Sequence, residues 1–401
     1  MAALPDLMAD PTLEAADAAI EAQGNREPHR PYLGMSEIGR SCSRALWYGF
    51  RWCSSKAFDA ATLKRFEDGH RGEDIQAARL RQVDDIELLT IDPRTGRQFG
   101  FADHGGHFRG HMDGSVHGLL QAPKTWHVWE HKQTDDKKQA ALVKAKQEHG
   151  EKGALAAWDA VYHGQAVLYM DYSSMARHYL TCATPGGRRT VSCRTNADGK
   201  AANALKAKAL KVIQADVPLA RVSDRPDWYE CKWCAHHAIC HGDQLPEINC
   251  RTCLHATPEL DGDGRWSCAR FGCDISTDTQ RQGEQCPDHR YIPALISFAE
   301  PVDADDGANW IEYVYGEGDT FRNGGPGGLS SSEMRALGKA GLVDAEASTI
   351  KKPSEEPGRD QTKTSLEVTS APWSPAANAG TSDAIRAAAQ ASAPAPWTVK
   401  A

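Results

Sequence analysis

The sequence predicts an α/β (α+β) protein in which helices flank a central mixed sheet, followed by a small cysteine-rich module and a disordered tail. Three observations indicate this order. Segments with helical apolar spacing alternate with short runs of alternating polar and apolar residues up to about residue 215. Eight of the twelve cysteines then fall between Cys231 and Cys286. The last segment, 345–401, is rich in Ala, Ser, Pro and Thr, a composition typical of disorder.

The individual elements follow from local periodicity and capping residues. The expected helices are 11–22, a helix capped by Ser36 or Ser41 that runs toward Trp52, 59–83, 135–170 and 201–215. The apolar stripe of 59–83 is expected to consist of Leu63, Phe66, Ile75 and Leu80. Antiparallel strands joined by tight turns are expected in 86–119, and further strands in 126–132, 176–183 and 190–194. Ser330-x-x-Glu333 matches a capping box before a short helix.

Bulk composition excludes some classes of protein. The hydrophobic content of 40% and the charged content of 25% are ordinary for a soluble protein, and no apolar run approaches the roughly 20 residues of a membrane helix. The first residues lack the basic region and apolar core of a secretory signal, so we expect a cytoplasmic protein.

A net charge of −8 argues against coating nucleic acid by bulk electrostatics. Phosphate contacts need only a local basic groove, for which two lysine clusters are candidates: 132–146 and 200–211. Solvated helix faces are the alternative for both.

One constellation of residues carries hydrolytic chemistry. Asp113 ends one strand, and alternation along the next strand places Glu130 and Lys132 on the same face. His131 then points the other way, so that only its carbonyl faces the site. Two carboxylates and a carbonyl form the hard oxygen cage that Mg²⁺ or Mn²⁺ prefers. Lys132 is suited to orient an attacking water and to neutralise charge in the transition state.

Taken alone, Asp…Glu-x-Lys is a weak signal, because such residues are common on exposed strands. Two further patterns strengthen it. Gln165-x-x-x-Tyr169 places both side chains on one helix face, and Gly69-His-Arg-Gly-Glu73 supplies a third acidic group from a helix.

Four ordered motifs can be read in this part of the chain: Gly-x-x-x-Glu at 69–73, Gly-x-x-Asp at 110–113, Glu-x-Lys at 130–132 and Gln-x-x-x-Tyr at 165–169. Together they resemble the RecB-like nucleases of the PD-(D/E)XK superfamily, especially phage exonucleases and CRISPR-associated nucleases with an iron-sulfur cluster. The resemblance covers about 36–242. It implies a restriction-endonuclease-like core, a catalytic Asp113, Glu130 and Lys132, and a positioning role for Gln165 and Tyr169 toward DNA or the lysine. Glu73 stands where a histidine is commoner, which leaves open whether Glu73 or His70 contacts metal. Met112 replaces the proline that names the superfamily, at a tolerant position.

Clustered cysteines in a reducing compartment indicate metal rather than disulfides. Cys231, Cys234 and Cys240 form a C-x₂-C-x₅-C run that supplies three thiolates. In similar nucleases the fourth comes from the N-terminal helix, where Cys42 matches, and this implies a [4Fe-4S] cluster on these four residues. Zinc is the rival metal, and Cys53 is a competing N-terminal ligand.

A second group has the spacing of a zinc ribbon. We expect Zn²⁺ on Cys250, Cys253, Cys268 and Cys286, with Cys273 or His289 as possible replacements for one of them. Trp266 fits a small strand packed over that site. Cys182 and Cys193, on expected strands, are taken as buried structural cysteines.

The resulting hypothesis is a metal-dependent DNA exonuclease of phage or bacterial recombination, repair or processing, which acts on single-stranded DNA or duplex ends. A structure- or site-specific endonuclease and a non-catalytic DNA-binding module are alternatives, and a recombinase or single-strand annealing protein is a plausible partner by family analogy. The expected parts are an N-terminal extension (1–30), the nuclease domain with its iron-sulfur cluster (31–243), a zinc-binding module (244–298), a small unassigned segment (299–344) and the tail (345–401).

Overall fold

The structure is a computed structural model that describes residues 10–55, 57–275, 282–283 and 286–343. By its contacts the chain divides into Met1–Glu346 and Ala347–Ala401, and the second unit lies outside the described residues, as does the predicted disordered tail. Among the described helices, none is long and apolar enough to cross a bilayer.

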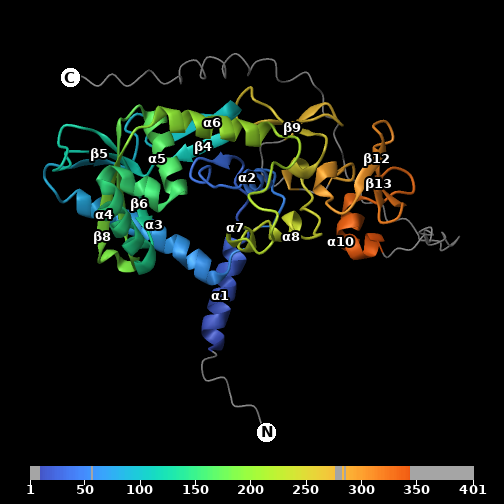
Figure 1. Ribbon diagram of the computed structural model, residues 1–401, viewed down its shortest axis with the longest axis horizontal. Coiled ribbons are helices and arrows are strands. Elements are labelled where there is room, and N and C mark those ends of the chain that lie inside the picture. The colour runs from blue at the N-terminus through green and yellow to red at the C-terminus, as the bar shows by residue number, and fades with distance from the viewer. Residues whose placement is uncertain (1–9, 56, 276–281, 284–285, 344–401) are drawn as a thin grey trace, which may run out of the picture. The chain divides into compact units, whose positions relative to one another are not determined.

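A five-stranded mixed sheet forms the centre of the main unit (Figure 1). Only β6 and β7 pair in parallel, while the other neighbours are antiparallel. The strands, in sheet order, are β2 (Glu87–Leu89), β5 (Gly114–His117), β6 (His127–Gln133), β7 (Arg177–Ala183) and β8 (Thr190–Asn196). The predicted central mixed sheet is therefore present, with β6 in its middle.

Helices cover both faces of this sheet. Trp129 of β6 packs with Ala77 and Leu80 of α3 on one face, while Val128 belongs to the large core on the other face. That large core receives side chains from α2, α4, α5 and α6, and α5 lies beside α6 (Figure 1). The helices are α2 (Ser43–Phe50), α3 (Ala60–Leu80), α4 (Asp136–Trp158), α5 (Ala160–Ser173) and α6 (Gly199–Gln214). Alternation along β6 thus gives each face its own helix layer.

Two expectations about helices are wrong. The segment 135–170 is not one helix, because Asp159 adopts an extended conformation between α4 and α5 and its side chain accepts the N–H groups of Val161 and Tyr162. The apolar stripe expected in α3 is buried only at Leu80, because Phe66 is 48% exposed and Ile75 is 42% exposed. The buried side also includes Gly72 and Ala77, and a Cβ at Gly72 would collide with the Gln133 amide on β6. Close approach at Gly72 and apolar packing of Leu80 together hold this helix against the sheet.

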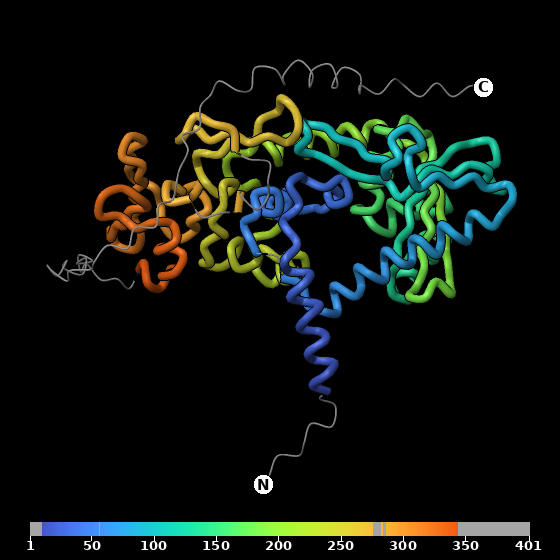
Figure 2. Tube along the Cα trace, turned by 180° about the vertical axis from the view of Figure 1, so that it is seen from behind, coloured from blue at the N-terminus to red at the C-terminus, as the bar shows by residue number. Residues whose placement is uncertain are grey.

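The N-terminal helices are capped differently from one another. Asp10 caps α1 (Pro11–Gly24), and Asp59 caps α3. Figure 2 shows α1 running up to the start of α3, which it contacts. Neither Ser36 nor Ser41 caps α2, because Cys42 occupies the N-cap position without a side-chain cap bond. The prediction that Ser36 or Ser41 caps this helix is therefore wrong. The Cys42 thiol does not cap the helix either.

A second, three-stranded sheet borders the central sheet. In it β1 (Leu33–Gly34) pairs in parallel with β4 (Phe108–His111), and β3 (Gly100–Asp103) pairs antiparallel with β4. Asp113 lies two residues beyond the end of β4 and immediately before β5, so it stands where the two sheets meet.

The cysteine-rich part contains short elements. They are α7 (Tyr229–Lys232), α8 (His237–Cys240), β9 (Ala256–Pro258), β10 (Trp266–Cys268) and β11 (Cys273–Ile275), the last three forming one antiparallel sheet. A separate small core around Tyr313 and Met334 joins a further sheet to a helix. Its elements are β12 (Glu300–Asp305), β13 (Trp310–Tyr315), β14 (Asp319–Gly324) and α10 (Ser331–Val343). The predicted capping box is confirmed. The Ser330 N–H donates to Glu333 Oε2 at 2.7 Å, and the Glu333 N–H donates to Ser330 Oγ at 3.2 Å.

Candidate active site

Asp113, Glu130 and Lys132 come together because of strand register. Gly114 pairs with Trp129, which brings Asp113 beside the next two residues of β6. The His131 N–H donates to Asp113 Oδ2 at 2.8 Å, and the Asp113 N–H donates to Glu130 Oε1 at 3.3 Å. Lys132 Nζ donates to Glu130 Oε2 at 2.7 Å. The Glu130 and Lys132 side chains are therefore bonded directly, and Asp113 joins them through backbone hydrogen bonds.

Burial governs the electrostatics of this group. Burial and then the Asp113 charge raise the pKa of Glu130 to about 8, against the lowering effect of Lys132. Burial likewise raises the pKa of Asp113. Burial lowers the pKa of Lys132, but the neighbouring Glu130 and Asp113 carboxylates outweigh it, so the pKa rises overall. Lys132 thus keeps its charge because it faces two buried carboxylates.

Gln165 and Tyr169 lie together on α5, next to the group. Gln165 Nε2 donates to Glu130 Oε2 at 2.9 Å and lies 3.4 Å from the Tyr169 hydroxyl. Glu130 Oε2 therefore accepts from both a lysine and an amide. The Tyr169 ring is 1% exposed and packs on Gly110, where a Cβ would come within 2.8 Å of it. The four-residue step predicted to place both side chains on one helix face does so.

Helix α3 brings both candidates for a third group to the same cavity. Glu73 interacts electrostatically with Asp113 and Lys132, and burial, followed by Asp113, raises its pKa to about 7. His70 also lines the cavity and interacts with Asp113. The His131 ring points away, as expected, with Nδ1 3.0 Å from the Thr181 hydroxyl, so only its backbone faces Asp113.

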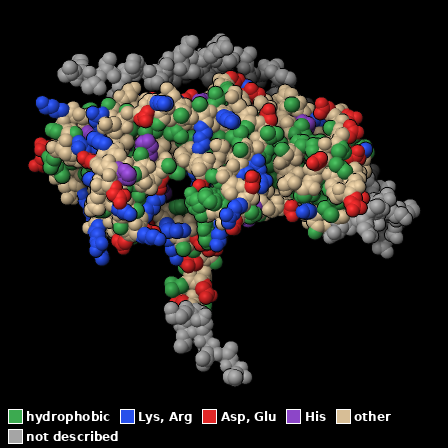
Figure 3. All heavy atoms as spheres, viewed as in Figure 1, with side chains coloured by type: hydrophobic (Ala, Val, Ile, Leu, Met, Phe, Trp, Pro, Cys, Tyr) green, Lys and Arg blue, Asp and Glu red, His purple; other side chains and the backbone are tan. Residues whose placement is uncertain are grey.

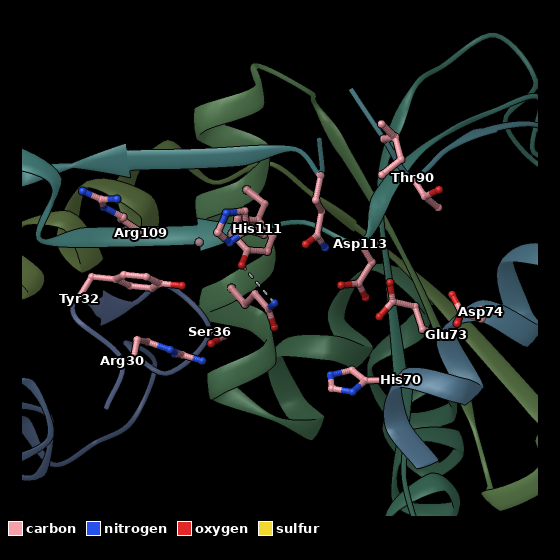
Figure 4. Close-up of a pocket in the computed structure, with 15 residues that line it drawn as sticks. Arg30, Tyr32, Ser36, His70, Glu73, Asp74, Thr90, Arg109, His111 and Asp113 are labelled. Carbon is pink, nitrogen blue, oxygen red and sulfur yellow. Dashed lines mark hydrogen bonds between the residues drawn. The ribbon is translucent and has the colours of Figure 1, made fainter. Parts of the chain in front are cut away.

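The cavity has a second wall that the sequence patterns did not indicate. It encloses about 670 Å³ and is also lined by Arg30, Tyr32 and Arg109. The Arg30 and Arg109 guanidinium carbons lie 5.6 and 5.9 Å from the Tyr32 ring centroid. Figure 4 shows this basic wall across the cavity from the acidic wall, which consists of Glu73, Asp74 and Asp113. Alternation along β4 predicts that Arg109 and His111 point to the same face of the sheet. No sequence pattern places Arg30 beside them.

The lysine clusters that the sequence singled out are largely engaged elsewhere. Lys138 bonds Asp159 at 2.8 Å, and Lys146 donates to the Ser192 carbonyl at 2.7 Å. Lys206 pairs with Asp171, and Lys208 donates to backbone carbonyls of Ile38 and Arg40. On the face in Figure 3, basic and acidic side chains are interspersed. The basic side of the cavity is thus formed by Arg30 and Arg109 rather than by either lysine cluster.

The first cysteine group converges on one cavity. Cys42, Cys231, Cys234 and Cys240 all line a space of about 660 Å³. Burial raises the pKa of the Cys231 thiol, and Cys240, Cys42 and Cys234 raise it further. Cys53 does not line this cavity and lies fully buried in the core.

The second cysteine group is also mutually coupled. Burial raises the pKa of Cys250 to about 11, and Cys253, Cys286 and Cys268 contribute. Cys182 and Cys193 are fully buried in the core, as predicted. Within the described residues, no three His, Cys, Asp or Glu side chains stand in a geometry ready to hold a single metal ion. The two cysteine groups are therefore candidate metal sites by their donor chemistry and charge, without a preformed cage among the described residues.

Comparisons with known proteins leave the family open. No family model matches the sequence, and no curated protein matches it. Among solved structures, the chain is similar to SSO0001, with a TM-score of 0.33 and 15% identity over 58% of this chain and 96% of that chain. It is also similar to an alkaline exonuclease (LHK-Exo) from Laribacter hongkongensis, with a TM-score of 0.32 and 11% identity over 49% of this chain and 90% of that one. The same exonuclease in complex with dAMP gives 0.31 and 11% over 50% and 90%. Scores and identities this low carry no conclusion about the present chain.

Proposed function

We propose that this protein is a metal-dependent DNA nuclease with a PD-(D/E)XK active site, formed by Asp113, Glu130 and Lys132. The observation that carries the proposal is the cluster in which Lys132 bonds the buried Glu130 carboxylate and Asp113 is bonded to the backbone of the same strand. Asp113 also lines a cavity whose opposite wall is basic, which suits a polyanionic substrate.

The donor set fits a hard divalent cation. Burial raises the pKa values of Glu73, Asp113 and Glu130, and the Asp113 charge raises those of Glu73 and Glu130 further. Lys132 lowers all three pKa values, but it does not outweigh these effects. Carboxylates crowded in this way gain most from a cation, and the His131 carbonyl completes an oxygen set typical of Mg²⁺ or Mn²⁺. When bound, such an ion would polarise a phosphodiester oxygen and lower the pKa of a water.

The chain's own residues have separable roles in this proposal. Lys132 orients the attacking water and stabilises negative charge that develops on the phosphoryl oxygens. Gln165 holds Glu130 Oε2 in place beside Lys132, and Tyr169 supports Gln165. Arg30 and Arg109 bind the phosphate backbone. Hydrolysis forms a P–O bond to water and breaks the bond to the leaving oxygen, which takes up a proton.

We further propose a [4Fe-4S] cluster on Cys42, Cys231, Cys234 and Cys240. Its support is the shared cavity and the mutual charge interaction of the four thiols, with the Arg44 and Arg221 side chains near Cys240 to favour thiolates. The cluster would join α2 to the segment after α6. We also propose that the protein acts as an exonuclease at DNA ends in recombination or repair. Its partner would be a recombinase or a single-strand annealing protein.

The test compares end-labelled linear DNA with circular DNA in the presence of Mg²⁺, Mn²⁺ or EDTA, using anaerobically purified full-length protein. Metal-dependent loss of the linear DNA alone supports an exonuclease, while cleavage of the circle supports an endonuclease. Lys132→Ala is expected to lower the rate by about 100- to 1,000-fold, as loss of one transition-state donor does.

A matched control separates chemistry from general charge. Lys144 has a side chain that is 73% exposed and lies outside the cavity, so Lys144→Ala should retain full activity. Equal activity of Lys132→Ala and wild type, with both folded, would refute the assignment of the active site. Inactivity of wild type with a loaded cluster would instead favour a DNA-binding role.

A further inference from the structure

Two arginines are buried beside the second cysteine group. Arg51 is 2% exposed and Arg251 is 1% exposed, and among the described residues neither guanidinium forms an ion pair with a carboxylate. Arg251 donates to the carbonyls of Phe50 and Pro31 at 3.0 and 2.9 Å and to Gln282 Oε1 at 2.8 Å. Arg51 donates to the Arg251 and Ala215 carbonyls at 3.1 and 3.2 Å. Among the described residues Arg51 Nε has no hydrogen-bond partner, and the acceptors named above are neutral. The Asp216 carboxylate favours the charge of Arg51, but no carboxylate acts in this way on Arg251 among the described residues.

Aromatic rings surround both guanidinium groups. The Arg251 guanidinium carbon lies 3.8 Å from the Trp52 ring centroid and 4.8 Å from that of Trp266, and the Arg51 guanidinium carbon lies 5.3 Å from the Trp266 centroid. Ring faces attract cations, but they carry no net charge and cannot neutralise two adjacent cations. A compensating anion is therefore expected close to Trp266.

The second cysteine group is the anion source adjacent to Arg251, whereas Asp216 acts on Arg51. Cys250 precedes Arg251 in the chain and interacts with it electrostatically, and Trp266 lies on the same short strand as Cys268. Neutral thiols would leave Arg251 without an anionic neighbour among the described residues. Four thiolates on one divalent cation carry a net charge of −2, which equals the charge of the arginine pair.

Local backbone structure presents these thiols in the manner of metal-binding turns. The Cys253 N–H donates to the Cys250 carbonyl at 3.2 Å, and the His289 N–H donates to the Cys286 carbonyl at 3.1 Å, so each pair forms a tight turn. A bridge between Cys253 and Tyr291 places these two turns side by side. Cys268 ends β10, opposite Ala256 of β9.

The two alternative ligands of this group are disfavoured. His289 has both ring nitrogens engaged, at 2.8 Å from Ser331 Oγ and 3.2 Å from Thr252 Oγ1. Cys273 is exposed on β11 and does not contribute to the charge interactions of Cys250.

We propose that Cys250, Cys253, Cys268 and Cys286 bind one Zn²⁺ as a dianionic tetrathiolate, and that the buried Arg51 and Arg251 pair is its counter-charge. Binding releases four thiol protons and forms four Zn–S bonds, with no change in oxidation state. The proposal is independent of the nuclease activity, because it concerns the junction between α2 and the cysteine-rich sheet.

The first experiment measures zinc and iron per chain in full-length protein purified anaerobically. One zinc is expected in wild type and in Cys273→Ser, and none in Cys250→Ser or Cys286→Ser. Absence of zinc from wild type, or iron that is lost with Cys250→Ser, would overturn the proposal. Because the variants could fail to fold, wild type is also produced with Co²⁺, for which a tetrathiolate gives intense charge-transfer and tetrahedral ligand-field absorption. A weak octahedral spectrum would contradict the site.

The second experiment tests the counter-charge. Arg251→Met is expected to weaken zinc binding by about 10- to 100-fold in competition with a chromogenic chelator, the range typical of groups that support metal ligands. Arg265→Met is the control, since Arg265 lies in the same small sheet region but is paired with Asp261 and Asp274 at the surface. Equal zinc affinity of Arg251→Met and Arg265→Met would refute the role of the buried pair.

Discussion

Glu130 is the residue on which the candidate site converges. Its Oε2 accepts from Lys132 and Gln165, and its Oε1 accepts from the backbone of Asp113. The carboxylate is 1% exposed, so water cannot replace a lost donor easily. Each donor therefore orients the carboxylate and also stabilises its charged form.

Removing the amide donor should lower turnover rather than substrate binding. Gln165→Leu deletes one hydrogen bond to a buried charged acceptor, and we expect kcat to fall by roughly 10- to 100-fold with little change in KM. Tyr169→Phe should have a smaller effect, because its hydroxyl lies 3.4 Å from Gln165 and does not touch Glu130. Steady-state kinetics on labelled linear DNA measure both, and a larger defect in Tyr169→Phe would contradict this order.

His178 makes the folded state sensitive to acid. It lies fully buried on β7, neither ring nitrogen has a hydrogen-bond partner among the described residues, and burial lowers its pKa to about 3. Between the ordinary histidine pKa of about 6.5 and that value, the unfolded chain binds more protons, so stability falls as the pH falls. His178→Gln should flatten the slope of unfolding free energy against pH by up to about 1.4 kcal/mol per pH unit. Urea unfolding at pH 4.5 to 7 measures it, and an unchanged slope would show that His178 is not the source.

Among the elements, strands were easier to predict than helix faces. Alternation of side chains sufficed to place Glu130 and Lys132 together and to direct His131 away, because this period is a property of the strand itself. The buried side of α3 could not be predicted, since it depends on the close approach of Gly72 to Gln133, more than fifty residues away. The break at Asp159 was present in the sequence as a capping residue, but apolar periodicity on either side concealed it. Arg30 reaches the cavity only through tertiary structure.

Two glycines of α3 should respond oppositely to the same substitution. A Cβ at Gly69 meets nothing within 4 Å, so Gly69→Ala should stabilise the protein by about 0.5–1 kcal/mol through helix propensity. A Cβ at Gly72 collides with the Gln133 amide, so Gly72→Ala should gain nothing or be destabilising. Thermal or urea unfolding of both variants decides, and stabilisation by Gly72→Ala would disprove the close approach.

Considered as one molecule, the main unit is held together by contacts between its N-terminal segment and residues beyond 215. Trp47 Nε1 donates to the Ala215 carbonyl at 2.7 Å, and Asn249 Nδ2 donates to the Trp52 carbonyl at 3.1 Å. Ser41 also bonds Glu230 beside the first cysteine group. These ties are made by α2 and its flanks, which also carry Cys42.

Loss of the proposed iron-sulfur cluster should therefore loosen this junction rather than the central sheet. Cys42→Ser is expected to lose its iron and its visible absorption and to lower the Tm by several degrees, while Cys273→Ser keeps both. Limited proteolysis should cut first near 41–55 or 216–242. A Cys42→Ser protein with full iron content would refute Cys42 as a ligand, and cleavage inside β6 first would contradict the location.

The hydrogen bonds from Arg251 to Phe50 and Pro31 span 201 and 220 residues of sequence. During synthesis, the segment around α2 emerges early but cannot be completed until the chain beyond residue 251 has left the ribosome. At about 5–20 residues per second, that interval lasts about 10 to 40 s. Throughout it, Trp47, Phe50 and Trp52 lack their final neighbours, so the nascent chain presents an aromatic surface on which chaperones would be expected to act.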